Sequence, residues 1–532
     1  MGTAAVGAAA LGVAAGATSL VPNVNAAVIR AQPGPVTATA SSSVLPSTWD
    51  METDVLVAGA GLAGLAAALR AVQSGVKVLL VEAGQETGGC ALFSGAILHT
   101  SSAVTLADYQ KLDPLVDPVL GELQSVTFPQ VLTWIRGMPS IPISTGSLGA
   151  NSLDFGSGAA TYADKREYCD GFNNLIEEGG GTILYGTSVV DLWQDPLTKT
   201  VIGARAALTG PAPANSSIGT SSINIKAKAV ILCTGGFQNN KELLVRYFGQ
   251  WADLAVARCQ PYSGGSALLM GVKAGAKLSR GMGKGYGHTQ AWPIVVPQTP
   301  ATYEPFDKTF LYQIMSGNGI QALDGAGIYV NLYGNRYINE ATNIFNAASN
   351  VLNYAHMLQP FARVFSIFDS SSALANSTAG KAMLAIQSQA GAVVLQATTI
   401  ANLATALSTQ FGVNPDNFVA TVNAYNTAVA AGAQAAADLP VPRSAPLNPI
   451  TTPPFYAIPA TTGVTCTYGG LAIDTECHVL DTNSTPIPGL FASMGAAGGI
   501  YYDGYIGSLA NVTVFGYLAG GSAANYAKSV AT

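Results

Sequence analysis

A glycine-rich turn near the start of the chain has the residue types that bind a diphosphate. The run GAGLAG places Gly59, Gly61 and Gly64 between an apolar stretch, 54–58, and a helix-forming stretch that ends at Gly75. In a strand–turn–helix unit, Gly59 makes the tight turn, Gly61 lets the backbone approach a pyrophosphate, and Gly64 lets the helix pack on the strand. The helix N-terminus adds partial positive charge. The spacing therefore predicts a dinucleotide site.

An acidic residue follows at the distance that such a site requires. The second apolar stretch, VKVLLVE, ends in Glu82. A carboxylate at the end of this strand accepts hydrogen bonds from the adenosine ribose and repels a 2′-phosphate. Glu82 therefore favours FAD or NAD over NADP.

Four further motifs follow in chain order. TGGCALFSGA carries Gly88, Gly89, Ser94 and Gly95; VILCTGGF carries Thr234 and Gly235; GIYVNLYGNRYINE spans 327–340; and a glycine- and tyrosine-rich segment spans 486–520. Together with GAGLAG, these motifs resemble the flavoprotein superfamily of fumarate reductase, succinate dehydrogenase and 3-ketosteroid dehydrogenases. The resemblance covers about residues 53 to 530.

The resemblance implies FAD as the cofactor and an α/β fold. His99 follows the SGA motif but lacks the spacing of the family's histidyl-flavin pattern, so we expect non-covalent binding, with covalent attachment as the alternative. A discontinuous Rossmann-like FAD-binding domain, 51–283 and 455–532, would carry an inserted α+β cap, 284–454, with helices from about 370 to 438. The implied cofactor-binding residues are Gly59, Gly61, Gly64, Glu82, Gly88, Gly89, Ser94, Gly95, Val189, Thr234, Gly235, Gly495, Gly507, Ser508 and Leu509. Gly507 and Ser508 would supply helix N-terminal amides to the flavin.

The residues that grip a dicarboxylate in fumarate reductases are replaced in this chain. Matching the family motifs puts Trp292 and Cys466 at the two histidines, Ile344 at the catalytic arginine and Tyr505 near the second arginine. No arginine occurs from 339 to 359 or after Arg443. We therefore expect a pocket without a guanidinium, in which Trp292, Ile344 and Cys466 face the substrate.

The tyrosines of the C-terminal segment resemble those of the 3-ketosteroid dehydrogenase branch, to which the chain is closest in character. The tail VFGYLAG is similar to that branch's "TFGYVAG", and the match puts Tyr502 at its ketone-binding tyrosine. The base-supplying tyrosine of the branch would fall at Asn343 or Ile344, so Tyr505 and Tyr468 are the alternative candidates. A phenol donates a proton readily but accepts one only when its anion is stabilised.

These features predict an oxidoreductase that adds or removes hydrogen across a C=C bond next to a carbonyl, in an apolar, 3-ketosteroid-like or enone substrate. The direction stays open. One alternative is a fumarate-reductase-type enzyme that reduces an unsaturated carboxylic acid and receives electrons from a separate carrier. A second alternative is a flavin-binding protein without catalysis. Either enzyme would need a separate electron donor or acceptor.

Composition restricts the remaining possibilities. Of 532 residues, 49% are hydrophobic and 10% are charged, which excludes a disordered chain. A net charge of −6 without a basic block disfavours nucleic acid. The six cysteines and four histidines have neither disulfide-framework nor zinc-site spacing. We therefore predict no metal.

The N-terminus is expected to direct export. Residues 1–27 form an uncharged, Ala- and Gly-rich run ending in LVPNVNAA, which is typical of a signal of the twin-arginine type, although no arginine pair precedes it. Residues 28–50 are expected to form a linker. The mature chain would be periplasmic or extracellular and would lack a membrane span; without a functional signal it would be cytoplasmic.

Overall fold

The protein is described from a computed structural model, which covers residues 45–146, 149–155, 161–209, 222–294, 296–315, 326–341 and 354–530. These residues belong to one compact unit, Leu45–Thr532. The predicted export signal, most of the predicted linker, and Asn343 and Ile344 lie outside the described residues. Export and the position of Ile344 therefore stay predictions.

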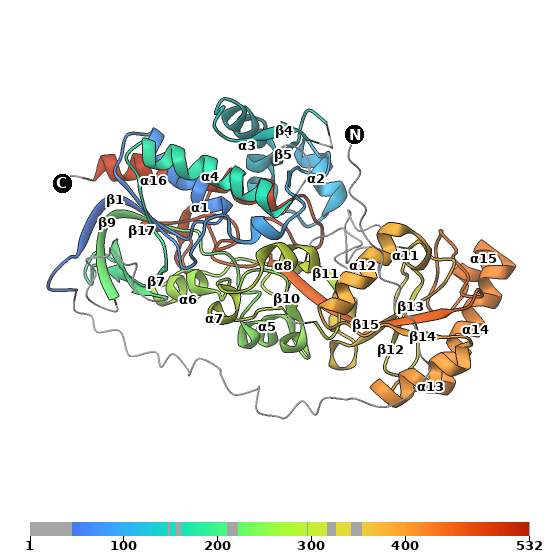
Figure 1. The fold of residues 1–532 in the computed structure, drawn as a ribbon. Helices are drawn as coiled ribbons and strands as arrows, with labels where there is room; N and C mark the ends of the chain where they lie inside the picture. Colours follow the sequence, from blue (N-terminus) through green and yellow to red (C-terminus); the bar gives the residue numbers. More distant parts are fainter. Residues whose placement is uncertain are drawn as a thin grey trace, which may run out of the picture. The chain divides into compact units, whose positions relative to one another are not determined.

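The larger sheet contains the predicted dinucleotide-binding unit (Figure 1). Its eight strands run in the order β16-β17-β9-β1-β2-β6, with β8 beside β9 and β7 beside β8. They are β1 (Met51–Ala58), β2 (Val78–Val81), β6 (Thr182–Leu184), β7 (Thr187–Gln194), β8 (Val201–Leu208), β9 (Ser222–Leu232), β16 (His478–Leu480) and β17 (Pro486–Ala492). β1 pairs in parallel with β2 and β9, and α1 (Leu62–Gln73) connects β1 to β2. The predicted α/β fold is confirmed.

The C-terminal part of the chain returns to this sheet. β17 pairs in parallel with β9, and the following helix, α16 (Ser508–Ser529), packs against α1. A Cβ on Gly516 or Gly520 would lie 2.3 or 2.2 Å from a backbone oxygen of α1. These glycines therefore allow the two helices to approach closely, which fixes the position of α16.

A second sheet of six strands combines strands of the predicted FAD-binding domain with strands of the predicted cap. Its strands are β10 (Val256–Ala257), β11 (Gly285–Ala291), β12 (Ile328–Asn331), β13 (Val364–Asp369), β14 (Leu395–Ala397) and β15 (Phe455–Thr467). The first half of β15 pairs with β13 and β14, and its second half pairs with β10 and β11. β15 begins directly after the predicted boundary at 454/455 and pairs with strands of the predicted cap. The domain boundaries stay predictions.

Helices cover the predicted cap between β13 and β15. The helices expected from about 370 to 438 are confirmed as α11 (Ala373–Asn376), α12 (Thr378–Gln389), α13 (Ile400–Phe411), α14 (Pro415–Ala431) and α15 (Ala433–Ala437). Leu403 of α13 and Phe418 of α14 are fully buried and pack with Phe365 of β13 in a separate hydrophobic core. The orange helices beside β13 and β15 in Figure 1 are these elements.

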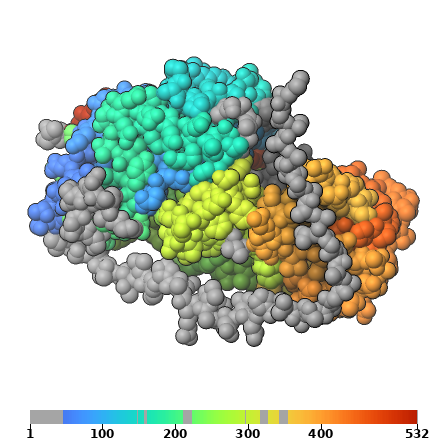
Figure 2. All heavy atoms as spheres, viewed as in Figure 1, coloured from blue at the N-terminus to red at the C-terminus, as the bar shows by residue number. Residues whose placement is uncertain are grey.

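The remaining elements surround the larger sheet. They are α2 (Leu106–Leu112), α3 (Pro118–Arg136), α4 (Tyr162–Glu178), α5 (Lys241–Phe248), α6 (Ser266–Lys273), α7 (Pro300–Tyr303), α8 (Lys308–Met315), η1 (Gly89–Phe93), η2 (Ala252–Leu254), η3 (Pro360–Ala362), and the small sheet of β3 (Ile97–Leu98), β5 (Leu153–Phe155) and β4 (Ile143–Thr145). In Figure 2, the teal-green residues of α4 lie beside the yellow-green residues of α8. Across the described ranges, no helix has the length and apolarity that crossing a membrane demands.

Candidate active site

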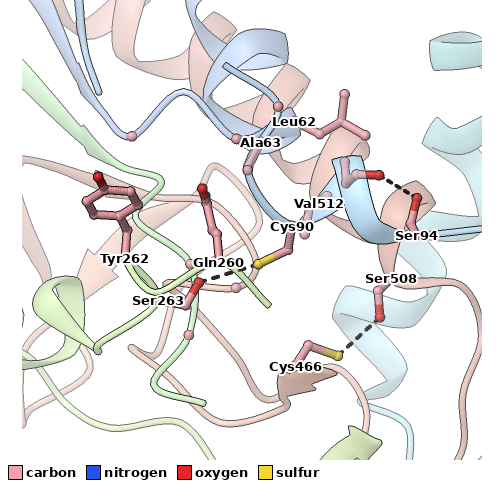
Figure 3. Close-up of a pocket in the computed structure, with 18 of the residues that line it drawn as sticks. Leu62, Ala63, Cys90, Ser94, Gln260, Tyr262, Ser263, Cys466, Ser508 and Val512 are labelled. Carbon is pink, nitrogen blue, oxygen red and sulfur yellow. Dashed lines mark hydrogen bonds between the residues drawn. The ribbon is translucent and has the colours of Figure 1, made fainter. Parts of the chain in front are cut away.

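A cavity lies at the carboxyl ends of β1, β2, β9 and β17. The edge where parallel strands end is the usual ligand-binding side of an open α/β sheet. The second sheet closes the cavity with Arg258, Tyr286, His288, Thr465 and Cys466. Figure 3 shows Cys90 of η1, Cys466 of β15 and Ser508 of α16 among the side chains that line this space.

Glycines leave one side of the cavity open to a ligand. A Cβ on Gly61 would have its nearest neighbour, the Cα of Gly89, 4.0 Å away, and one on Gly235 would meet the Ser263 hydroxyl at 3.4 Å. Both positions lie on the cavity wall, so a ligand can approach the bare backbone there. By contrast, a Cβ on Gly64 would lie 1.8 Å from the Gly59 oxygen, which is the close packing expected of the third glycine.

Glu82 closes the end of the cavity next to β2. Its carboxylate accepts hydrogen bonds from the backbone N–H groups of Ala60 and Gly84, both at 2.7 Å. Burial raises the pKa of this carboxyl group. A buried carboxylate beside a glycine-rich turn has the chemistry that the ribose hydroxyls of FAD require. The glycine cradle and Glu82 therefore fit FAD.

Most of the predicted cofactor-binding residues come together on this lining. They are Gly59, Gly61, Glu82, Gly88, Gly89, Ser94, Gly95, Val189, Thr234, Gly235, Gly495, Ser508 and Leu509. Gly64 packs inside the turn, and Gly507 directly precedes α16, where a Cβ would lie 1.8 Å from the His99 oxygen. Their contacts with FAD stay predictions.

The first turn of α16 opens into the cavity. Ser508 and Leu509 line it, and the Ser508 hydroxyl lies 3.3 Å from the Cys466 thiol, as Figure 3 shows. The unpaired backbone N–H groups at a helix N-terminus favour a negatively charged ligand group. The arrangement suits a cofactor whose ring becomes negatively charged on reduction.

A row of polar side chains crosses the wall formed by the second sheet. The Tyr505 ring stacks on Tyr286 with 4.0 Å between centroids, and the Tyr286 hydroxyl lies 3.3 Å from His288 Nε2. The His288 Nδ1 lies 3.0 Å from the Thr465 hydroxyl. Burial raises the pKa of Tyr505 to about 12 and holds the pKa of His288 well below its ordinary value. These groups are therefore uncharged at neutral pH.

Arg258 ends this row and corrects the expectation of a pocket without a guanidinium. Its side chain lines the cavity and is 4% exposed. Nη1 donates to the Thr465 hydroxyl at 3.4 Å, and Nε has no hydrogen-bond partner. The prediction was wrong because it considered the family's arginine positions, whereas β10 brings Arg258 beside Thr465 by pairing with β15.

Of the three predicted catalytic tyrosines, Tyr505 is the one that lines the cavity. The Tyr468 hydroxyl donates to the Gly504 oxygen at 2.8 Å, and the Tyr502 backbone N–H donates to Asp113. Neither residue belongs to the lining. Their catalytic roles stay predictions, without support from this geometry.

Of the predicted substrate-pocket residues, Cys466 lies in the cavity and Trp292 does not. The Trp292 ring instead lies 4.0 Å below the Arg363 guanidinium, near Phe411 of α13. Trp292 directly follows β11, four residues beyond His288, and that strand carries it away from the cavity. Ile344 is outside the described residues.

Sequence reasoning missed a thiol in the cavity, and it considered the histidine His99 only as a point of covalent flavin attachment. Cys90 follows the GG pair of η1 and lies 3.5 Å from the Ser263 hydroxyl. Hydrogen bonding with Cys259 lowers the pKa of the Cys90 thiol to about 7 in spite of its burial. His99 also lines the cavity, and burial lowers its pKa to about 4. The only signal for either residue was its proximity to the GG and SGA motifs.

Comparison with known proteins places these features in a family. The model of the family described as "FAD binding domain" matches residues 157–506, and one described as "FAD dependent oxidoreductase" matches 54–236. The chain is 27% identical over 504 residues to a urocanate reductase of Eggerthella lenta, which covers 90% of this chain and 76% of that protein. It is 26% identical over 503 residues to a fumarate reductase (cytochrome) of Shewanella frigidimarina, with 89% and 77% covered.

A solved structure shows the same fold. The 3-ketosteroid Δ1-dehydrogenase from Sterolibacterium denitrificans, determined with 1,4-androstadiene-3,17-dione, has a TM-score of 0.67 at 19% identity and covers 90% of this chain and 100% of its own. The match to the FAD binding domain model extends over more than half of the chain and confirms FAD as the predicted cofactor. The chain belongs to the FAD binding domain family and is an FAD-dependent oxidoreductase, with reductases of carbon–carbon double bonds among its relatives.

Proposed function

We propose that this protein reduces a C=C bond that is conjugated to a carbonyl-containing group. When bound, FAD supplies the hydride from its N5 atom. The chain must then deliver a proton to the neighbouring carbon and hold the carbonyl oxygen as it gains negative charge. The family and the names of the relatives support hydride chemistry at such bonds, and Tyr505 supports the proton transfer.

The single observation that carries this proposal is the Tyr505 phenol inside the cavity. Its hydroxyl lies within hydrogen-bonding reach of the backbone N–H and the hydroxyl of Ser508, the first residue of α16. With a pKa of about 12, about one molecule in 10⁵ carries the phenolate at pH 7, so base catalysis would start with a deficit of about 7 kcal/mol. The protonated phenol, by contrast, is present in every molecule. This difference favours reduction over dehydrogenation.

The chemistry of the substrate's activating group has two candidates. The sequence favoured a neutral 3-ketosteroid-like ketone or enone because no guanidinium was expected, and Arg258 removes that argument. The aromatic side chains of Tyr286, Tyr312 and Tyr505 still suit an apolar substrate body. An unsaturated carboxylic acid on such a body is the second candidate, and it is favoured specifically by the buried charge of Arg258.

Export and an external electron source are part of the same proposal. The Ala- and Gly-rich residues 1–27 support export to the periplasm or the medium. We expect a separate carrier to reduce the flavin, because the relative from Shewanella frigidimarina is named a cytochrome fumarate reductase. Export is tested by determining the mature N-terminus of exported protein. The electron source is tested by measuring reduction of the purified protein by candidate carriers.

The test of function is reoxidation of the reduced flavin. The purified FAD-loaded protein is reduced anaerobically with dithionite, and 4-androstene-3,17-dione, cinnamate, cinnamamide and fumarate are each added while flavin absorbance is followed. We expect stoichiometric recovery of the yellow absorbance with an enone or an enoate, together with the saturated product. If none of these compounds reoxidises the flavin, and reduction by saturated ketones or acids also fails, the protein is a flavin binder without this activity.

A further inference from the structure

Arg258 differs from the other buried arginines in having no acidic partner. Arg336 and Arg443 both pair with Glu340, at 2.6 and 3.2 Å. Among the residues that the structure describes, no carboxylate forms an ion pair with Arg258. Its one hydrogen bond goes to the Thr465 hydroxyl, and its Nε is a buried donor without an acceptor. Such a group is costly to leave unpaired.

Among the described groups around Arg258, only the Cys90 thiol can carry negative charge at neutral pH. The groups nearest to its charge are the phenols of Tyr286, Tyr312 and Tyr505 and the thiol of Cys90. The phenols are uncharged at that pH, whereas the Cys90 thiol is partly ionised, and its hydrogen bonds go to Cys259 and Ser263 rather than to Arg258. Burial accordingly lowers the pKa of Arg258 to about 10. The guanidinium still carries its charge.

Strand pairing fixes the backbone of Arg258. The Arg258 N–H donates to the Val464 oxygen at 2.8 Å, which continues the pairing of β10 with β15. On the other side of β15, His288 contacts the same Thr465 hydroxyl. Arg258 therefore follows a paired strand, and its side chain lines a cavity that Tyr505 also lines.

We propose that Arg258 binds the carboxylate of the substrate and thereby selects a single-acid enoate with an aromatic or apolar body. The inference rests on the proposed function. It assigns carboxylate binding to the residue that follows β10, a position outside the family motifs. A guanidinium binds a carboxylate through N–H···O hydrogen bonds, and among the described residues no hydrogen bond engages the second terminal nitrogen, Nη2, of Arg258. One guanidinium accommodates one carboxylate, so a dicarboxylate would leave its second charge among tyrosines.

The test measures binding of compounds that cannot react. The saturated acid 3-phenylpropanoate and its neutral amide, 3-phenylpropanamide, are titrated into the FAD-loaded protein, and dissociation constants are taken from the change in flavin absorbance. Arg258→Gln, Arg258→Lys and the exposed-site control Arg246→Gln are compared with the unmodified chain. FAD affinity and thermal unfolding of each variant are measured in parallel.

We expect the unmodified protein to prefer the acid over the amide. Arg258→Gln should weaken acid binding about 30-fold or more and change amide binding by less than about threefold. Arg258→Lys should recover part of the preference, because it keeps the charge but loses the planar fork. Arg246→Gln should change neither constant, since Arg246 pairs with Glu242 on the surface.

Two results would overturn the inference. Equal weakening of acid and amide would show a structural role for Arg258, and loss of FAD affinity in Arg258→Gln would show that the guanidinium serves the cofactor. Failure of the proposed function is a different result. If the acid preference depends on Arg258 but no C=C compound reoxidises the flavin, Arg258 is confirmed as an anion-binding residue and the proposed reductase function is refuted.

Discussion

The replacement Tyr505→Phe removes the proposed proton donor and little else. The phenylalanine ring can keep the stacking on Tyr286, whose centroid lies 4.0 Å away. The lost interactions are the hydrogen bonds of the phenol with Ser508, which contribute about 1 kcal/mol to stability. We therefore expect the variant to fold and to bind FAD with unchanged affinity.

The size of the effect follows from the surroundings of the hydroxyl. A positioned general acid contributes about 10²- to 10⁴-fold to a proton-transfer step. Among the described lining residues, the other proton donors near Tyr505 are already engaged, the Cys466 thiol with the Ser508 hydroxyl and the Tyr286 hydroxyl with His288. We expect reoxidation of the reduced flavin by cinnamate or an enone to slow at least 100-fold.

The assay is a single turnover of the reduced protein with saturating acceptor, followed by stopped-flow absorbance between pH 6 and 9. Since the pKa of Tyr505 is about 12, its protonated form persists throughout this range and should add no pH dependence to the rate. The control Tyr333→Phe changes a phenol that is 60% exposed. A rate for Tyr505→Phe within about threefold of the unmodified rate would refute the assignment.

Three further results can be anticipated. Glu82→Ala leaves the N–H groups of Ala60 and Gly84 without acceptors; the dissociation constant of FAD, measured by fluorescence, should rise at least about tenfold, and an unchanged constant would exclude a cofactor role. The Cys90 thiol of the FAD-free protein should react with iodoacetamide with a midpoint near its pKa of about 7, and FAD should block the reaction; a midpoint near that of an ordinary thiol, about 8.5, would contradict the hydrogen-bonded cluster. Burial lowers the pKa of His356 in the folded chain to about 3. As the pH drops below about 6.5, this histidine is protonated in the unfolded chain but not in the folded chain, so the free energy of unfolding decreases. By pH 5 the loss from His356 is about 2 kcal/mol, and urea unfolding of His356→Gln should show a pH dependence weaker by that amount.

The cofactor site could be predicted because its information is local. The turn from β1 to α1, the acid at the end of β2 and the GG pair of η1 each lie within a short stretch of sequence. Their glycine spacing and apolar periodicity have one structural interpretation, which is a parallel strand pair with a diphosphate at its edge. The cavity lining therefore includes thirteen of the fifteen predicted residues.

The substrate side could not be predicted in the same way. Tyr468, Tyr502 and Tyr505 are similar by residue type and position in the motifs, yet the backbone directs the Tyr505 ring into the cavity. The Tyr468 hydroxyl is used by the Gly504 oxygen. Side-chain direction in an irregular loop depends on tertiary contacts, and nothing in the residue type reveals it.

By itself, the sequence determined the strand–turn–helix unit, the FAD class of cofactor and the family, because short glycine and carboxylate patterns encode them. The tertiary structure alone decided that a guanidinium lines the cavity. Arg258 and Thr465 are brought together by the pairing of β10 with β15, and strand pairing between distant segments depends on how the whole chain packs.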